Sequence, residues 1–429
     1  KIHLIMSLKL KCHLENLLNI FMKIPDKIKN IWDLKITILI SLLPVALIAG
    51  TAISNLFILL INIFFIYIIF KNKKTNFLLN KFFIILILIW ILLFLNSIFI
   101  GNNFDSFIRS FGFIRFILLI FAFKYFFEED DNFSKNTVFT IWFIIFNIVT
   151  IDIFIEFTTG SNIFGIESAY KGRIASFTGE ELKIGNYYFG FILLALSFFY
   201  NNYFKDKKYF FYLVVLIFMI ASFLIGERSN FIKVFIACTI FMFLLDNKDY
   251  LKKLLILILS VFIVSIIFIN NNYFKQRFVG EIISPIMNKG LLSYVENSNY
   301  GKHYEIAKKI HKKNYLFGVG IKNYRLESGK KEYNINYSNF GGDIHPHQIH
   351  YEFLAETGLV GYLIFLIFFI FSIFYGFFRF FRDRNLYILS STLFILTTAL
   401  PLIPSGSFFT SFTASIFWLI LSARRQRSS

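Results

Sequence analysis

Long apolar stretches alternate with short polar segments along most of the chain. A membrane-spanning helix needs about 20 consecutive apolar residues, so this pattern predicts about twelve transmembrane helices. The first two share one apolar stretch of 35 residues, in which Pro44, Gly50 or Asn55 marks the break. The predicted spans are residues 36–52, 54–70, 82–100, 107–124, 137–157, 186–202, 209–225, 230–246, 252–270, 358–378, 386–403 and 406–421.

The expected fold is an all-α polytopic membrane protein with one large loop between the ninth and tenth spans. Residues 1–35 form a polar N-terminal segment, and residues 36–270 hold the first nine spans. The large loop covers residues 271–357, and a helix is predicted in it at Tyr300–His311. A second helix is predicted from Gln348 to Thr357, and it stops and restarts at Gly358 where it runs into the tenth span. The last three spans occupy residues 358–421, and residues 422–429 form a tail.

Composition narrows the class of protein. Of the 429 residues, 57% are hydrophobic and 16% are charged, whereas soluble domains are about 45–50% apolar and about 25% charged. This excludes a soluble enzyme, a disordered chain and a disulfide scaffold. The net charge of +18 fits cytoplasmic loops rich in Lys and Arg, so the expected partner is a lipid bilayer and not nucleic acid.

Lys and Arg counts predict the orientation. If the N-terminus is cytoplasmic, 25 Lys and Arg fall in the inner segments and 5 in the short outer loops. The large loop contains 12, but long loops translocate largely regardless of charge. Both termini are therefore expected in the cytoplasm, and the large loop outside.

Two short outer loops carry candidate anion-binding arginines. Arg228 lies in the turn Gly226-Glu227-Arg228-Ser229, and Arg173 lies in the loop before span six. A guanidinium group beside a helix N-terminus can bind phosphate oxygens together with backbone N–H groups. For Arg228, the alternative is a turn in which Ser229 or Asn230 caps the next span and the arginine extends to the membrane interface. For Arg173, the alternative is a solvated charged loop.

A third arginine lies deeper in the membrane. Arg115 is within span four, where no acidic residue is available to pair with it. A charged group in this position must face the interior of the helix bundle or a wet cavity. It either has a partner on another helix, such as Asp152 or Glu156, or it belongs to a substrate site.

Three histidines lead into span ten: His345, His347 and His350. Closely spaced histidines can chelate zinc, but no Cys lies nearby and Pro346 restricts the backbone, so no metal is expected. The favoured interpretation is a neutral imidazole at the mouth of the membrane domain, where it can act as a general base.

These motifs resemble the O-antigen ligase and O-antigen polymerase superfamily. His347-Gln348 followed by Leu354-Ala355-Glu356-Thr357-Gly358-Leu359-Val360-Gly361 is similar to its signature. Leu316–Ile321 resembles the Gly-x-Gly stretch of the family, and Gly226–Ser229 its outer arginine loop. The span layout also resembles GT-C-type membrane glycosyltransferases. Where the family usually has Arg and Trp before the Gly-x-Gly stretch, this chain has Lys302 as the available cation.

The resemblance implies a bacterial inner-membrane glycosyltransferase of lipopolysaccharide biosynthesis. Such an enzyme moves a glycan from undecaprenyl pyrophosphate to a hydroxyl of a lipid A–core or related glycolipid at the periplasmic face, without a metal or other cofactor. His347 is then the expected general base. The expected pyrophosphate ligands are Arg228, Arg173, Arg115 and Lys302. The expected neighbours of the histidine are His350, Glu352 and Gln348.

Two other functions stay open from the sequence. An O-antigen polymerase shares this layout and joins polyprenyl-linked repeat units. A polysaccharide or lipid transporter, or a flippase, would instead place ionisable groups near the bilayer midplane, often in two related halves. Here most of the candidate groups lie at the outer ends of the spans, which favours an enzyme.

Overall fold

The computed structural model describes residues 31–74, 81–129, 135–181, 183–204, 208–246, 249–334, 345–401 and 403–423. Most of the predicted N-terminal segment and of the predicted C-terminal tail lies outside these residues. Within them the chain forms helices and no β-strand beyond one isolated bridge, so the all-α fold class is confirmed.

The helices follow the predicted apolar pattern. The α-helices are α2 (Ile31–Ser41), α3 (Leu43–Ala49), α4 (Thr51–Lys71), α5 (Lys81–Asn96), α6 (Phe104–Gly112), α7 (Ile114–Lys124), α8 (Lys135–Thr159), α9 (Ile184–Phe199), α10 (Lys208–Leu224), α11 (Arg228–Leu245), α12 (Tyr250–Asn270), α13 (Asn272–Phe274), α14 (Ser284–Lys289), α15 (Leu291–Asn297), α16 (Asn299–Lys313), α17 (Tyr324–Glu327), α18 (Lys331–Asn334), α19 (Ile349–Asp383), α20 (Leu386–Thr398) and α21 (Ser411–Ala423). Short 3₁₀ or π segments are η2 (Ser97–Gly101), η3 (Tyr125–Glu129), η4 (Ser176–Glu181), η5 (Tyr200–Phe204) and η6 (Lys275–Ile283).

Every predicted span overlaps a helix, but the number of membrane crossings stays a prediction. Among the described residues, 7 helical segments are long and apolar enough to cross a membrane, and three further apolar helices, including α20 and α21, are shorter. The long first apolar stretch breaks at Gly50, whose φ of +130° favours glycine. The stretch also breaks between α2 and α3, where Pro44 lies in the first turn of α3. Two of the three predicted break positions are therefore confirmed.

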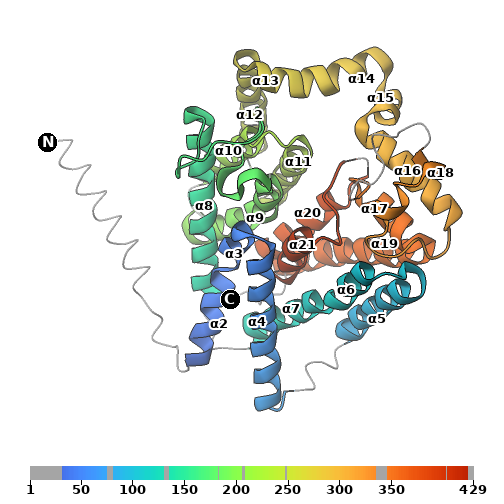
Figure 1. Cartoon of the computed structure of the whole chain (residues 1–429). Helices are drawn as coiled ribbons and strands as arrows, with labels where there is room; N and C mark the ends of the chain where they lie inside the picture. The colour runs from blue at the N-terminus through green and yellow to red at the C-terminus, as the bar shows by residue number, and fades with distance from the viewer. Residues whose placement is uncertain are drawn as a thin grey trace.

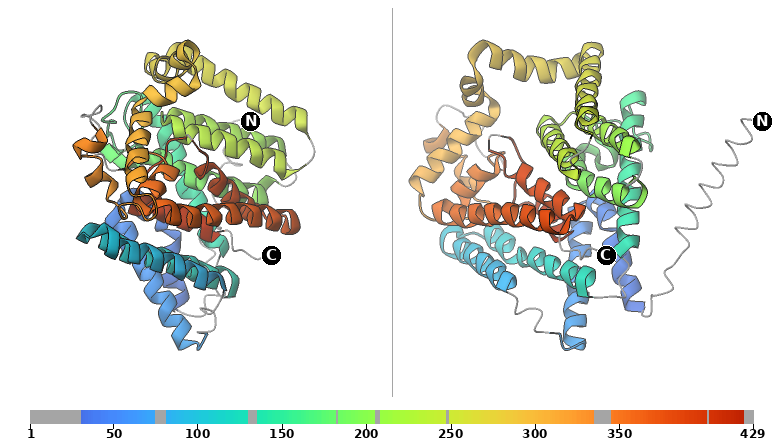
Figure 2. Two further views of the ribbon diagram at one scale, coloured as in Figure 1. Left: turned by 90° about the vertical axis from the view of Figure 1, so that its right-hand side faces the viewer. Right: turned by 180° about the vertical axis from the view of Figure 1, so that it is seen from behind.

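Three helices form the centre of the bundle. Nearly all side chains of α9, α20 and α21 are buried. Helix α9 packs against α8, α11 and α20, and α7 packs along α21. Figures 1 and 2 show α5–α7 running beneath α19, whereas α12 lies at the edge, where it packs mainly against α10. The ends of the central helices therefore meet inside the molecule and not at its lipid-facing surface.

The predicted large loop is itself helical. Its first part, residues 272–297, crosses from α12 to α16 and is called the arch here (Figure 1). Its second part contains α16, which confirms the helix predicted at Tyr300–His311. A small apolar core lies beneath this second part. Its members are Ile306, Ala307, Ile310, Val319, Tyr324, Tyr333 and Ala355.

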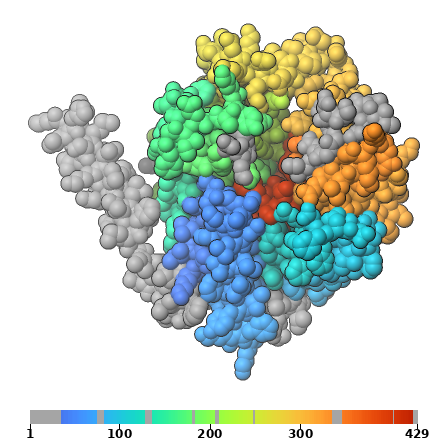
Figure 3. All heavy atoms as spheres, in the orientation of Figure 1, coloured from blue at the N-terminus to red at the C-terminus, as the bar shows by residue number. Residues whose placement is uncertain are grey.

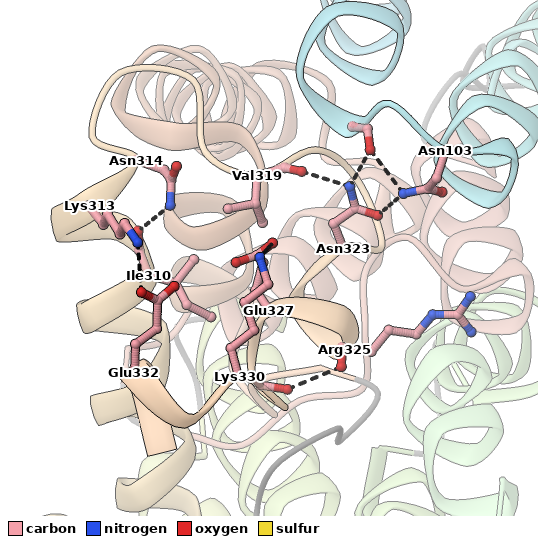
Figure 4. Close-up of polar contacts among 12 residues, drawn as sticks. Asn103, Ile310, Lys313, Asn314, Val319, Asn323, Arg325, Glu327, Lys330 and Glu332 are labelled. Carbon is pink, nitrogen blue, oxygen red and sulfur yellow. Dashed lines mark hydrogen bonds and ion pairs between the residues drawn. The ribbon is translucent and has the colours of Figure 1, made fainter. Parts of the chain in front are cut away.

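Polar contacts hold the second part of the loop together and also fix it to a membrane helix. Lys313 and Glu332 form an ion pair at 2.7 Å between α16 and α18. The Asn323 amide donates to the carbonyl oxygen of Val319 at 2.8 Å and also pairs with Asn103, the N-cap residue of α6. Figure 4 shows Asn323 between these two partners. The loop is therefore tied to the start of α6.

A crossing of two backbone segments explains the glycines of the family-like motif. Gly358 interrupts α19 at φ +65° and ψ −168°, and Gly318 has φ +68°. Four backbone hydrogen bonds of 2.8–3.1 Å join residues 315–320 to residues 355–360. A Cβ atom at either glycine would collide with the backbone of the other segment. The predicted interruption at Gly358 is confirmed, and its role is backbone packing.

Replacing Gly358 by alanine is expected to destabilise the protein strongly. The backbone conformation of Gly358 lies in a region that is essentially limited to glycine, with a cost on the order of 1–3 kcal/mol for other residues. The collision with the backbone of Leu316 and Phe317 adds to this cost. The measurement is the thermal unfolding midpoint of the purified protein in detergent. Gly280→Ala is the matched control, since its new Cβ meets only an ordinary contact. Equal midpoints for G358A and the wild type would contradict the argument.

Candidate active site

One large cavity of about 1120 Å³ lies among the helix ends and loops on one side of the bundle. Its wall includes the N-terminal ends of α4, α11 and α21, the arch, the start of α16, and residues 403–413. In the space-filling view, residues near the C-terminus (red) are visible between blue α3–α4 and orange α16–α18 (Figure 3). These are the segments that the Lys and Arg counts assign to the outer face.

The lining of the cavity is strongly cationic. Among the described residues, Arg109, Arg173, Lys183 and Arg228 line it, and Glu227 is the acidic residue among them. Burial raises the pKa of the Glu227 carboxyl above its usual range, although a hydrogen bond from Asn230 and the nearby Arg173 act in the opposite direction. A cavity with this excess of cations suits an anionic ligand.

Arg173 and Arg228 line one wall of the cavity, and Arg277, which does not line it, lies next to them. These three residues are called the arginine triad here. Arg228 donates from Nη1 to the carbonyl oxygen of Arg277 at 2.6 Å and to Glu281 at 2.9 Å. Burial, followed by repulsion from the other two arginines, lowers the pKa of Arg277. The triad joins three elements that are distant in sequence: the loop before α9, the start of α11, and the arch.

Close backbone packing brings two of these elements together. Gly226 has φ +78°, and a Cβ atom there would collide with the carbonyl oxygen of Gly172. The N–H of Ile174 donates to the carbonyl oxygen of Ile225 at 3.1 Å, which fixes the same contact. Glycine at position 226 therefore allows the loop that carries Arg173 to approach the start of α11. The alternative in which Ser229 or Asn230 caps α11 is not observed, because the N-cap residue is Glu227 and has no side-chain capping bond.

Arg115 does not pair with either of the predicted carboxylates. Asp152 accepts from the N–H of Ile163 at 2.8 Å. Glu156 accepts from the N–H groups of Ala175 and Ser176 at 3.1 and 2.7 Å. Both carboxylates therefore hold the outer loop 160–176 in place. The expected ion pair is wrong because backbone amides of this loop, and not a guanidinium group, satisfy these two acids.

Arg115 instead lies beside a different part of the cavity. Its Nη2 donates to the Ser411 hydroxyl at 3.1 Å, and its Nη1 donates to the carbonyl oxygen of Gly112. Arg109 donates to the same hydroxyl at 3.1 Å and lines the cavity, whereas Arg115 does not. The structure therefore groups Arg115 with Arg109 and not with the arginine triad.

His347 lines the same cavity as Arg228 and Arg173. Its φ is +57°, a left-handed conformation that is uncommon for a residue other than glycine. The N–H of Ser405 donates to the carbonyl oxygen of His347 at 2.8 Å and holds this conformation. Gln348 then caps α19, accepting from the N–H groups of His350 and Tyr351 at 2.7 and 3.2 Å. The hydrogen bond from Ser405 and the cap at Gln348 thus fix the backbone on both sides of the His347 imidazole.

Other rings surround this imidazole. The His345 ring centroid lies 4.1 Å from that of His347, His303 of α16 lies at 5.2 Å, and Tyr300 at 5.5 Å. Burial, with His347 and Lys322 as the next causes, lowers the pKa of His345 to about 3. His345 therefore remains neutral near pH 7 and adds no positive charge beside His347.

A buried polar network supports the loop that holds His347. Glu352 of α19 accepts from the Ser407 hydroxyl and from the N–H of Phe408, the latter at 2.7 Å. Lys322 donates from Nζ to the same hydroxyl at 2.9 Å. Because Ser407 lies two residues after Ser405, this network fixes the backbone that bonds to His347. Glu352 thus acts on the position of the loop and does not line the cavity.

The remaining predicted site residues lie away from the cavity lining. His350 contacts the carbonyl oxygen of Ala399 through Nε2 at 2.8 Å, so its ring faces α20. Lys302 lies on α16 but is not among the lining residues, whereas its neighbours Tyr300 and Tyr304 are. The structure therefore brings together His347, Arg228 and Arg173, and places Lys302 and Arg115 elsewhere.

Sequence reasoning missed Arg277 and Lys322. Arg277 is one of 12 Lys and Arg residues in the large loop, and no spacing or motif distinguishes it from the others. Lys322 directly follows the Gly-x-Gly stretch, a position that could have drawn attention to it. Its Nζ is buried between α19 and residue 407, where only the folded chain reveals its partners.

The arginines and His347 could together bind a diphosphate and remove a proton from a hydroxyl group within the same cavity. Guanidinium groups bind phosphate oxygens through paired hydrogen bonds. A neutral imidazole accepts a proton near neutral pH. Both groups line one cavity with tyrosine side chains and hydroxyl groups beside them.

Comparison with known proteins supports this resemblance for part of the chain. Residues 211–366 match the family model described as O-antigen ligase, and members of this family are membrane glycosyltransferase-type enzymes. The match runs from α10 through the arch into α19 and includes Arg228, Arg277 and His347. A comparison with curated proteins finds no match. Residues 211–366 therefore form a domain of the O-antigen ligase and polymerase superfamily, as the motifs of the sequence predicted.

Proposed function

We propose that the protein transfers a glycan from a polyprenyl pyrophosphate, of the undecaprenyl type, to a hydroxyl group of a lipid A–core or related glycolipid. The observation that carries this proposal is the cavity shared by His347, Arg228 and Arg173. The cavity lies at the helix ends that the Lys and Arg counts assign to the outside. We place it at the periplasmic face of a bacterial inner membrane, with both termini in the cytoplasm.

The arginine triad is proposed to stabilise the leaving group. In the reaction the bond between the anomeric carbon and the phosphate oxygen breaks, and the pyrophosphate leaves with the electron pair. Positioned guanidinium groups neutralise this developing charge without rearranging during the reaction. The Glu281 carboxylate, which pairs with Arg228 at 2.9 Å, is half-exposed. A substrate phosphate can take its place on the guanidinium group.

His347 is proposed to activate the acceptor. The acceptor hydroxyl attacks the anomeric carbon from the side opposite the pyrophosphate, which inverts the configuration. As the new C–O bond forms, the imidazole of His347 accepts the hydroxyl proton. Neutral His345 at 4.1 Å adds no charge that would oppose protonation of His347. The left-handed backbone conformation of His347 is held by the hydrogen bond from Ser405 and by the helix cap at Gln348.

Transfer by the purified protein is the direct test. In detergent, without a membrane gradient, the full chain is expected to move glycan from an undecaprenyl pyrophosphate donor to lipid A–core. Because arginines supply the charge neutralisation in this proposal, EDTA should change the rate by less than about twofold. The rate is followed by gel mobility of the glycolipid product. A requirement for an ion gradient would indicate a carrier, and a loss of activity in EDTA that Mg²⁺ restores would contradict the arginine mechanism.

The choice of acceptor separates ligase from polymerase. With lipid A–core and polyprenyl-linked repeat units offered together, a ligase lengthens the core lipid, whereas a polymerase lengthens the polyprenyl-linked chain. The ligase is favoured here because the matched family model is described as O-antigen ligase.

A further inference from the structure

A second group of cations lies beside the cavity, apart from the arginine triad. Arg109 of α6 and Arg115 of α7 both donate to the hydroxyl of Ser411 at 3.1 Å. Two guanidinium groups that share one oxygen atom repel each other. Among the described residues, neither arginine forms an ion pair with a carboxylate within 4.0 Å. The protein therefore places two like charges together without an acidic partner, with Arg109 exposed and Arg115 half-buried.

Neighbouring groups increase the positive potential. Ser411 is the first residue of α21, whose N-terminal end carries a partial positive charge. Lys183 places its ammonium 5.4 Å from the ring centroid of Phe412, one residue further along. Cations in a membrane domain are costly, face the bundle interior or a water-filled cavity, and mark candidate substrate sites. A phosphate group bound here would offset the repulsion and accept hydrogen bonds from both arginines.

The cavity gives access to this second group. Arg109, Lys183 and Ser411 line it, together with Thr410 and Thr413. Arg115 lies behind Ser411 and contacts the cavity only through that hydroxyl. An anion that enters the cavity therefore meets Arg109 and Ser411 directly, with Arg115 as the supporting charge.

The two cation groups belong to different walls. The arginine triad is built from the arch, the start of α11 and the loop before α9, and it is partly neutralised by Glu281. The second group is built from α6, α7 and α21. Arg277 is repelled by Arg173 and Arg228, and neither Arg109 nor Arg115 is among its charged neighbours. One diphosphate at the triad therefore leaves the second group available.

We propose that Arg109, Arg115 and Ser411 form a second anion subsite, which binds a phosphate group carried by the acceptor lipid. This inference rests on the proposed function, in which a donor diphosphate occupies the arginine triad. Two lipid-borne substrates then bind in one cavity, each through its own phosphate. The subsite orients the acceptor so that its hydroxyl reaches His347, and it selects acceptors that carry phosphate.

Binding stoichiometry tests the subsite independently of transfer. The probe is geranylgeranyl pyrophosphate, added to the full-length protein in detergent and counted by native mass spectrometry. The wild type is expected to bind two molecules. R109Q/R115Q should retain the copy at the triad and bind the other at least tenfold more weakly, and R173Q/R228Q should show the reverse. A wild type that binds one molecule, or an R109Q/R115Q variant that still binds two with unchanged affinity, would overturn the proposal.

Two controls make this result specific. R109K/R115K retains both charges, so its second affinity should fall between those of the wild type and R109Q/R115Q, with an unchanged unfolding midpoint. Competition with lipid A and with its dephosphorylated form identifies the source of the phosphate. Displacement of one probe by lipid A alone supports an acceptor of lipid A type, and displacement of neither probe supports a polyprenyl-linked acceptor. Equal displacement by both forms would contradict recognition of phosphate. Because the readout is binding, failure here leaves the proposed transfer reaction to be judged by its own assay.

Discussion

Replacing His347 by alanine is expected to lower the glycan transfer rate by about 100- to 10,000-fold, the usual contribution of a general base. Binding of the polyprenyl pyrophosphate should remain, because the arginine triad is unchanged. The comparison is therefore between the initial transfer rate and the dissociation constant of the donor, measured on the same purified sample. Loss of rate with retained donor binding is the expected signature of a base that acts on the acceptor.

The control for this experiment is another histidine of the large loop. His311 lies on α16 and contacts the carbonyl oxygen of Leu354 through Nδ1 at 3.1 Å, outside the cavity lining. H311Q should transfer glycan at a rate within about threefold of the wild type. H347Q should be as impaired as H347A, since an amide does not accept the proton. Transfer by H347A at the wild-type rate would remove the general base assignment.

Replacement of Arg228 is expected to have the second large effect on the transfer rate. R228Q removes a charge aimed at the leaving group and should reduce the transfer rate by about 100- to 1000-fold, as the loss of a positioned donor does in other enzymes. R228K retains the charge but loses the planar fork that holds the carbonyl oxygen of Arg277 and the Glu281 carboxylate. R228K should therefore remain well below the wild type, with a weaker affinity for the donor.

An exposed arginine provides the matched control. Arg325 lies in the same large loop and pairs with Asp105 at the surface. R325K should leave the transfer rate and the donor affinity unchanged within about twofold, because exposed ion pairs contribute little. If R228K, like R325K, transferred glycan at the wild-type rate, positive charge alone and not a shaped phosphate site would explain the role of Arg228.

The helices of the fold could be predicted from the sequence. Apolar stretches identify membrane helices because lipid requires every backbone group to be bonded within the helix. The interruption at Gly358 was also predictable, since glycine tolerates the conformation needed there. The number of membrane crossings is harder to predict, because α20 and α21 are short and buried within the bundle and need not meet the usual length.

The site could be predicted only in part. His347, Arg228 and Arg173 were identified because their motifs place unusual polar groups beside predicted spans, and they line one cavity. Arg277 and the true partner of Arg115 could not be found in this way. Ser411 lies 296 residues from Arg115, and no local pattern encodes such a contact. The arch brings Arg277 to Arg228 only after the large loop has folded.

The backbone crossing at Gly318 and Gly358 has a mechanical consequence. A glycine that interrupts a membrane helix often permits bending, but here hydrogen bonds on both sides of the interruption close the joint. We therefore expect the part of α19 after Gly358 and the part that begins just after His347 to move together as one rigid body. A change in bilayer thickness that tilts α19 is therefore expected to shift the His347 imidazole relative to Arg228 on α11.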